Sequence, residues 1–340
     1  MTNKKHLRIG IVGATGLMGQ ELLTVLTELD LPIGDIHLAA SKSSVGEEIE
    51  CMGKSYPVVA LTPDFFENMN LCFFYATPEV SEQFVPIALD RGCYVIDQNE
   101  LIGDEFQTMV VPEVNVRALD REDSRYVRNP SSISIPLSIV LSPLSKAYQI
   151  EEVFVATYQS VSTRGQRGIE ELTRQITGML NYHEVESDVF PQRIAFNLIP
   201  NMGGLSEDGD SWEELRVAKE LRSMLQSNTL NAHVHMVQVP TYIGAGMAVT
   251  VRCKEDMTVD DVRAVLSESE GVKFIDAPSK QTYPVLLDVQ GQDEVLVGRI
   301  RVPSVQPNVL SFWVVNDNLK KGSTLNSAQI AKHIVDRFFS

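Results

Sequence analysis

The sequence predicts a two-domain α/β protein, in which a Rossmann-type doubly wound parallel sheet is followed by an α+β domain. Three observations support this fold class. The first half alternates short apolar runs with helical patterns, as parallel strands joined by crossover helices do. A glycine-rich turn joins the first apolar run to the first helical pattern. The second half has longer, half-alternating runs, and 340 residues suit two domains.

The first half is expected to begin with a buried strand and an amphipathic helix. In that helix, Leu22, Val25, Leu26 and Leu29 recur on one face. The predicted strands are 7–12, 36–41, 71–76 and 94–97, and the predicted helices are 17–29 and 80–89.

The second half is expected to form a mixed or antiparallel sheet with helices on one face. Asn129-Pro130 is the predicted seam between the domains, because the residue before a proline tends to leave the helix. The segment 203–212 is expected to be an exposed loop. The predicted strands are 152–160, 233–242, 248–253, 294–302 and 310–317, and the predicted helices are 167–180, 211–226, 258–268 and 326–339.

Composition excludes several classes of protein. With 29 basic and 45 acidic residues, the net charge of −16 argues against nucleic-acid binding and against docking on an anionic membrane. No apolar stretch reaches about 18 residues, and residues 1–6 do not resemble a secretory signal. The four cysteines form no C-x-x-C pair, which favours reduced thiols and a cytoplasmic location. His233 and His235 share a strand face without an evident third ligand, so no metal is predicted.

The strongest local signal is the run from Gly10 to Gly19, in which Gly13, Gly16 and Gly19 form G-x-x-G-x-x-G between a strand and a helix. Small residues there let the backbone approach a pyrophosphate at the helix N-terminus. The pattern therefore predicts dinucleotide binding, and the alternative is a tight turn without a ligand.

The residues after the next strand bear on which dinucleotide binds. An acidic residue there would favour NAD, but the sequence has Ser41-Lys42-Ser43-Ser44. Hydroxyls and a lysine suit a 2′-phosphate better, so NADP is favoured. A polar turn with a solvated lysine is the alternative.

Several ordered runs resemble the aspartate-semialdehyde dehydrogenase family nearly end to end. The resemblance implies a Rossmann domain of residues 1–129 joined by a C-terminal helix, 324–340, and a second domain, 130–323, that forms a homodimer. The matching runs are 13–16 (GATG), 110–115 (VVPEVN), 157–159 (TYQ), 168–172 (GIEEL), 191–197 (PQRIAFN), 297–301 (VGRIR) and 317–319 (DNL).

The same resemblance implies an altered active site. Ser132 stands where the family has its cysteine nucleophile, and Ala245 stands where it has its catalytic histidine. Gln238 replaces an arginine that grips the substrate carboxylate. The family's phosphate-gripping arginine is missing after Asp97, where Glu100 and Asp104 would repel an anion. Gln159 and the helix pair of Glu213 and Arg216 are retained as candidate catalytic and substrate residues.

The cofactor residues that the resemblance implies are only partly retained. Thr163 and Arg164 are bulkier than the family's residues near the nicotinamide, as are Thr77 and Pro78 in a second stretch. The adenosine end is therefore the better conserved half of the expected NADP site. The candidate cofactor residues are Gly13, Thr15, Gly16, Leu17, Met18, Ser41, Lys42, Ser44, Gly165 and Asn318.

Three functions remain open from the sequence. The leading hypothesis is a catalytically degenerate family member, similar to the Usg-type paralogues of bacteria, with a binding or regulatory role. The second is an NADP-dependent oxidoreductase acting on another aldehyde or carbonyl through Ser132, Gln159 or Tyr242. The third is a structural dimer with an empty cofactor cleft. A hydrolase using Ser132 is disfavoured, because no G-x-S-x-G elbow surrounds it. No sequence feature names a further partner, although a heterodimer with an active paralogue is conceivable.

Overall fold

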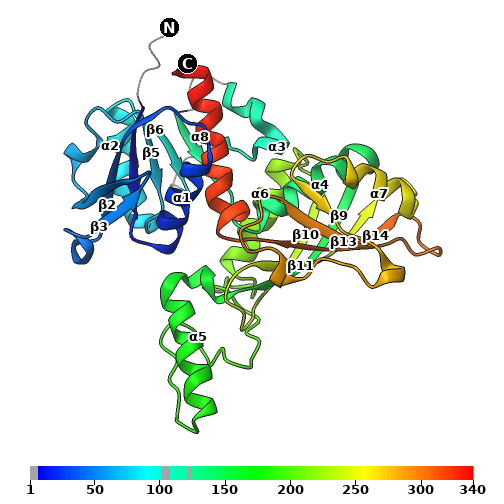
Figure 1. Cartoon of the computed structure of the whole chain (residues 1–340). Coiled ribbons are helices and arrows are strands. Elements are labelled where there is room, and N and C mark those ends of the chain that lie inside the picture. The colour runs from blue at the N-terminus through cyan, green and yellow to red at the C-terminus, as the bar shows by residue number, and fades with distance from the viewer. Residues whose placement is uncertain (1–6, 101–107, 121–124, 340) are drawn as a thin grey trace. The chain divides into compact units, whose positions relative to one another are not determined.

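The computed structural model describes residues 7–100, 108–120 and 125–339, and the chain clusters into two compact units. Unit 1 comprises residues 1–130 and 323–340, and unit 2 comprises residues 131–322. Each unit has its own sheet (Figure 1). The chain therefore leaves unit 1 after Pro130 and returns to it at Ser323.

Unit 1 is built on a sheet with the strand order β3-β4-β2-β1-β5-β6-β8-β7. All neighbours are parallel except the β3–β4 hairpin, and the strand order reverses at β1, between β2 and β5. This confirms the predicted doubly wound sheet. The strands are β1 (Leu7–Val12), β2 (Ile33–Ala40), β3 (Glu48–Cys51), β4 (Lys54–Ala60), β5 (Leu71–Phe74), β6 (Tyr94–Asp97), β7 (Thr108–Met109) and β8 (Tyr126–Arg128).

Helices cover both faces of this sheet. The apolar faces of α1 (Leu17–Glu28) and α8 (Leu325–Phe338) share one core cluster, whereas α2 (Pro78–Asp90) belongs to a second cluster. The short α3 (Pro112–Asn115) also contacts α8. Asn326 fixes the start of α8, because its side-chain amide donates to Asn129 Oδ1 at 2.6 Å and to the Val110 carbonyl at 2.9 Å.

Unit 2 contains a mixed sheet with the order β10-β9-β11-β14-β13-β12, as the half-alternating patterns predict. Helices α4, α6 and α7 pack on this sheet, and α5 stands apart from it (Figure 1). The strands are β9 (Ile150–Gln159), β10 (Asn231–Gln238), β11 (Ala245–Cys253), β12 (Val272–Phe274), β13 (Val295–Arg301) and β14 (Val309–Asn316), and the helices are α4 (Ser134–Tyr148), α5 (Gly165–Leu180), α6 (Trp212–Met224) and α7 (Val259–Ser267).

The buried helix α4 is an element that the sequence patterns did not predict. Ten of its residues are buried, so it lacks the polar face that gives a surface helix its period. Its first turn is held by Ser131, whose hydroxyl accepts the Ser134 N–H at 3.1 Å. A serine hydroxyl before an apolar run is therefore the signal that could have located this helix.

Two buried polar side chains organise the segment 165–211, called the arm here, which begins with α5 and ends before α6. Glu171 accepts the backbone N–H groups of Asp188 and Val189 at 2.9 and 2.6 Å. Gln175 accepts those of Ile194 and Ala195, both at 3.0 Å. These contacts replace the regular secondary structure that the segment after α5 lacks.

No helix in the described ranges is long and apolar enough to cross a membrane. Within the same ranges, no cluster of His, Cys, Asp and Glu side chains could hold a metal ion. All four cysteines are buried and free.

Candidate cofactor and active sites

The glycine turn after β1 has the geometry that close backbone packing requires. Gly13 has φ +86°, and a Cβ there would lie 2.3 Å from the Tyr75 carbonyl oxygen. A Cβ on Gly19 would lie 2.4 Å from the Gly13 carbonyl oxygen. Gly16 is the N-cap of α1, so the N-cap residue contributes no side-chain hydrogen bond, and the first turn of the helix contains no acidic residue. The start of α1 therefore has the features of an anion site at a helix N-terminus.

The serine-rich turn lies at the carboxyl end of β2, the strand that neighbours β1. Ser41 occupies the N-cap position of a short 3₁₀ turn over Lys42–Ser44, and its hydroxyl lies 2.8 Å from the Ser43 hydroxyl. Lys42 is exposed. Within unit 1, the structure therefore brings the turn's hydroxyls and one ammonium to the same sheet edge as the glycine turn. Ligands of doubly wound folds bind at this edge.

Asp97, at the carboxyl end of β6, is buried among hydrogen-bond donors. Its Oδ1 accepts from Ser81 Oγ at 3.1 Å and from the Asn99 N–H at 3.0 Å, and Tyr126 donates to Oδ2 at 3.4 Å. Burial outweighs these donors and raises the Asp97 pKa to about 6.

The acidic segment after Asp97 faces an arginine that the sequence analysis did not consider. Glu100 Oε2 lies 3.3 Å from Arg128 NH1, and the Arg128 side chain is almost fully buried. Asp104, the other predicted repelling residue, lies outside the described residues. Glu100 is thus partly neutralised by a cation on β8.

In unit 2, strand register places three candidate residues in one row across the sheet. Ala245 on β11 pairs with Gln159 on β9, and Gln159 pairs in turn with Gln238 on β10. On its other side, Ala245 pairs with Asn316 on β14. All four residues are buried. This row, called the amide row below, therefore consists of three side-chain amides and one methyl group.

The side chain of Gln238 hydrogen-bonds to the backbone of unit 2. Its Nε2 donates to the carbonyl oxygens of Gln159 and Ser160, both at 2.7 Å. Its Oε1 accepts from Thr163 Oγ1 at 3.2 Å. The side chain that replaces the family's arginine thus ties the end of β9 to the turn before α5.

Asn318, in the segment after β14, hydrogen-bonds to residues next to this row. Its Oδ1 accepts the Gly244 N–H at 2.6 Å, and its Nδ2 donates to Ser162 Oγ at 3.0 Å. Asn318 is buried, so the amide holds the turn before Ala245 rather than facing solvent. Gly165 opens α5 with φ +64°, and a Cβ there would meet no neighbour within 4 Å.

Ser132 lies at the start of α4 on a loop that a buried carboxylate anchors. Glu220, fully buried on α6, accepts the Ser131 N–H at 3.0 Å and the Arg216 Nε–H at 2.9 Å. Arg216 also lies 3.9 Å from Glu213. The retained acidic-basic pair is therefore part of a three-residue network, and Glu220 is the member that the sequence analysis missed. Its place one helical turn after Arg216 was the available signal.

Ser132 and the amide row meet at Gly322. A Cβ on Gly322 would lie 3.2 Å from the Ser132 carbonyl oxygen and 2.8 Å from Asn316 Nδ2. His233 and His235, by contrast, lie on exposed positions earlier on β10. The row can donate and accept hydrogen bonds, but amides and hydroxyls have no ionisable group to serve as a base near neutral pH.

Of the predicted cofactor residues, those from Gly13 to Ser44 belong to unit 1, whereas Gly165 and Asn318 belong to unit 2. A doubly wound sheet with a glycine turn, followed by a mixed-sheet domain, is the architecture of two-domain nicotinamide-dependent dehydrogenases. Residues 8–122 match the family profile described as "Semialdehyde dehydrogenase, NAD binding domain", and residues 141–321 match "Semialdehyde dehydrogenase, dimerisation domain".

Comparisons with whole proteins agree with these domain matches. The aspartate-semialdehyde dehydrogenase of Rickettsia bellii is 35% identical over 336 residues, covering 98% of this chain and 99% of that protein. The Bacillus subtilis enzyme is 35% identical over 339 residues, covering 97% and 98%. The crystal structure of aspartate semialdehyde dehydrogenase II from Vibrio cholerae has a TM-score of 0.94 and 32% identity, covering 98% of this chain and all of that one. The chain belongs to the aspartate-semialdehyde dehydrogenase family.

Proposed function

We propose that this protein binds NADP but does not catalyse the semialdehyde dehydrogenase reaction. The observation that carries the proposal is the amide row. The position of the family's base is Ala245, and its strand partners are Gln159 and Asn316. Proton transfer by a positioned base is worth roughly 10²–10⁴ in rate, and a methyl group supplies none of it.

The nucleophile position supports the same conclusion. Ser132 offers a hydroxyl in place of a thiol, and a hydroxyl attacks a carbonyl only when a neighbouring base activates it. In unit 2 the backbone of Ser132 approaches Gly322, which offers no side chain that could act as a base. Gln238 is engaged with backbone carbonyls, so it does not grip a carboxylate as an arginine would.

NADP is the proposed cofactor because of the two turns at the carboxyl edge of the unit 1 sheet. The uncapped start of α1 suits the pyrophosphate, and Lys42 with the Ser41 and Ser44 hydroxyls suits a 2′-phosphate. We therefore propose that the protein is cytoplasmic and that it has a binding or regulatory role in place of catalysis.

The test is calorimetric titration with NADP and NAD, followed by an assay of NADP reduction with aspartate semialdehyde and phosphate. We expect tighter binding of NADP than of NAD and no turnover. Restoring only Ser132→Cys should not rescue activity, since the thiol would lack a base. The combination of Ser132→Cys, Ala245→His and Gln238→Arg should give at most a trace. Turnover of on the order of 1–10³ per second by the unmodified protein would refute the proposal. Reduction of NADP with another aldehyde would instead support the alternative oxidoreductase.

We also propose that the protein is a homodimer through unit 2. Helices α4, α6 and α7 pack on its sheet, yet Phe154 on β9 and His233 on β10 remain exposed. Phe154 is 44% exposed and stacks on His233 with ring centroids 4.7 Å apart. Exposed aromatic rings on a sheet favour cover by a second surface. Sedimentation at micromolar concentration should give about twice the chain mass, and a monomer there would contradict the proposal.

A further inference from the structure

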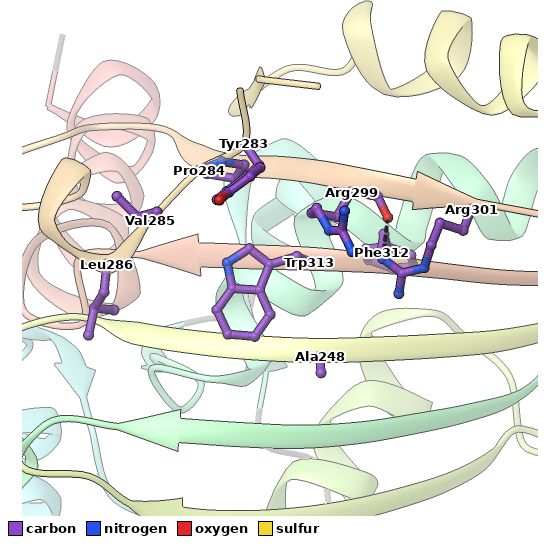
Figure 2. Close-up of a pocket in the computed structure, with 9 residues that line it drawn as sticks. All are labelled: Ala248, Tyr283, Pro284, Val285, Leu286, Arg299, Arg301, Phe312 and Trp313. Carbon is purple, nitrogen blue, oxygen red and sulfur yellow. Dashed lines mark hydrogen bonds between the residues drawn. The ribbon is translucent and has the colours of Figure 1, made fainter. Parts of the chain in front are cut away.

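A pocket of about 670 Å³ beside β13 and β14 belongs to the sheet face on which the homodimer is proposed to form (Figure 2). Two of its lining residues, Trp313 and Ala248, pair with each other, and Ala248 pairs in turn with Ala156 on β9. Ala156 lies two residues from exposed Phe154, so both side chains are on one face. This pocket is therefore part of the expected dimer surface rather than a ligand site.

In unit 1, Asn99 follows β6 at the carboxyl edge of the sheet, and hydrogen bonds hold nearly all of its polar groups. Its backbone N–H donates to Asp97 Oδ1 at 3.0 Å, and its carbonyl oxygen accepts from the Tyr126 hydroxyl at 3.1 Å. Its side-chain Nδ2 donates to the Ala76 carbonyl oxygen and to Ser81 Oγ, both at 3.0 Å. Within the described residues, no N–H or O–H group donates to Asn99 Oδ1.

Buried partners fix which way the Asn99 amide points. Ser81 and Asp97 are fully buried, and Ser81 Oγ donates its only proton to Asp97 Oδ1 at 3.1 Å. The Ser81 oxygen and the Ala76 carbonyl can therefore only accept from Asn99. A flipped amide would set Asn99 Oδ1 against two acceptors, so the observed orientation is the stable one. It leaves Oδ1 on the far side of the amide as an acceptor without a donor.

The position of Asn99 relates it to one half of the proposed dinucleotide. The proposed 2′-phosphate turn follows β2, and the proposed pyrophosphate site follows β1, which lies between β2 and β5. The other half of a dinucleotide then extends over the carboxyl ends of β5 and β6. Ala76, which holds the Asn99 amide, follows β5 directly, and a Cβ on Gly13 would lie 2.3 Å from the Tyr75 carbonyl oxygen. Asn99 is thus on the nicotinamide side of the glycine turn.

An amide oxygen without a donor selects the chemistry of its ligand. Phosphate and carboxylate groups offer only acceptors at neutral pH, so they cannot pair with Asn99 Oδ1. The nicotinamide half of a dinucleotide carries hydrogen-bond donors at its ribose hydroxyls and its carboxamide. A site built to bond such a donor loses affinity for a ligand that lacks it.

We propose that Asn99 binds the nicotinamide half of NADP, with Oδ1 accepting a hydrogen bond from a neutral donor of that half, and that Asp97 and Ser81 are the positioning residues that orient the amide. This inference rests on the proposed binding of NADP and adds a residue that the sequence analysis did not consider.

The test is calorimetric titration of the full chain with NADP and with 2′,5′-ADP, which has the adenosine half alone. Asn99→Ala should weaken NADP about tenfold and leave 2′,5′-ADP unchanged. The retained 2′,5′-ADP binding also shows that unit 1 of the variant is folded. Asp97→Asn keeps an acceptor oxygen for Ser81 and for the Asn99 N–H, so it should retain most of the NADP affinity. Asn228→Ala, at an exposed asparagine of unit 2, is the matched control and should change neither affinity.

A second ligand distinguishes the two possible donors. The analogue of NADP with nicotinate in place of nicotinamide has a carboxylate instead of the carboxamide. Weaker binding of this analogue by the wild type, with no such difference in Asn99→Ala, assigns the donor to the carboxamide. Equal binding by the wild type, together with the loss of NADP affinity in Asn99→Ala, assigns the donor to a ribose hydroxyl.

Three outcomes would overturn the inference while leaving NADP binding intact. Equal losses of NADP and 2′,5′-ADP in Asn99→Ala would mean that Asn99 only supports the fold. An unchanged NADP affinity in that variant would mean that Oδ1 makes no contact with the ligand. Wild-type affinities that are equal for NADP and 2′,5′-ADP would mean that the nicotinamide half is not bound. A wild type that binds neither ligand would instead refute the proposed function itself.

Discussion

Replacing Asp97 by asparagine should stabilise unit 1 at alkaline pH, and the gain should shrink as the pH falls. Burial raises the Asp97 pKa from 3.8 to about 6, so keeping the carboxylate ionised in the folded chain lowers the free energy of unfolding. At 1.36 kcal/mol per pKa unit, the difference corresponds to about 3 kcal/mol at pH 8. At pH 5 the folded carboxyl is mostly protonated, and the remaining cost is about 1.6 kcal/mol.

The sign follows from proton uptake. Between pH 3.8 and about 6 the folded state binds more protons at Asp97 than the unfolded state does, so this group makes stability rise as the pH falls. Asparagine is a fair isostere here. Its Oδ1 can keep the bonds from Ser81 and the Asn99 N–H, and its Nδ2 can donate to the Tyr126 hydroxyl, which itself donates to the Asn99 carbonyl at 3.1 Å.

The assay is urea denaturation of the wild type and Asp97→Asn at pH 8 and pH 5. Other carboxylates also titrate in this range, so the difference between the two proteins is the quantity to compare. We expect that difference to fall by about 1.4 kcal/mol from pH 8 to pH 5. A difference that stays constant across this range would show that Asp97 is not held with a raised pKa. A variant less stable than the wild type at pH 8 would show that the carboxylate's hydrogen bonds outweigh its burial.

Three further substitutions test other features. Lys42→Glu should weaken NADP about ten- to hundredfold in calorimetry while leaving NAD less affected, and equal losses for both would remove Lys42 from the 2′-phosphate site. Glu171→Ala should lower the free energy of unfolding by on the order of 3 kcal/mol in urea denaturation, because the N–H groups of Asp188 and Val189 would lose their acceptor. Replacing the exposed neighbour, Glu170→Ala, should change it little. Gly246→Ala should cost about 1–3 kcal/mol and shift Trp313 emission, because the new Cβ meets the indole ring; an unchanged spectrum would contradict the close approach.

The elements that could be predicted from sequence are those with a local signature. The glycine turn follows from spacing alone, and β1 begins and ends at the predicted residues. The β3–β4 hairpin was missed because its turn residues, Met52 and Gly53, both adopt positive φ, and Met52 gives no sign of this.

The parts of the site that the sequence could not provide depend on long-range register. The hydrogen bonds of Gln238 need β9 and β10 to pair in one particular alignment, and these strands are separated by the whole arm and α6. The orientation of the Asn99 amide likewise depends on Ala76 and Ser81, which lie in another segment. Candidate residues could therefore be named individually, but their partners could not.

The return of the chain to unit 1 at Ser323 bears on biosynthesis. Unit 2 is one uninterrupted stretch, so all of it can leave the ribosome and fold as soon as Gly322 has emerged. The core of unit 1 includes Leu325, Ala328, Ile330 and Ile334 from α8, which is translated after all of unit 2. Of the two units, unit 1 is thus the later to complete its core, and a chain truncated before residue 323 would carry a folded unit 2 together with an exposed, aggregation-prone unit 1.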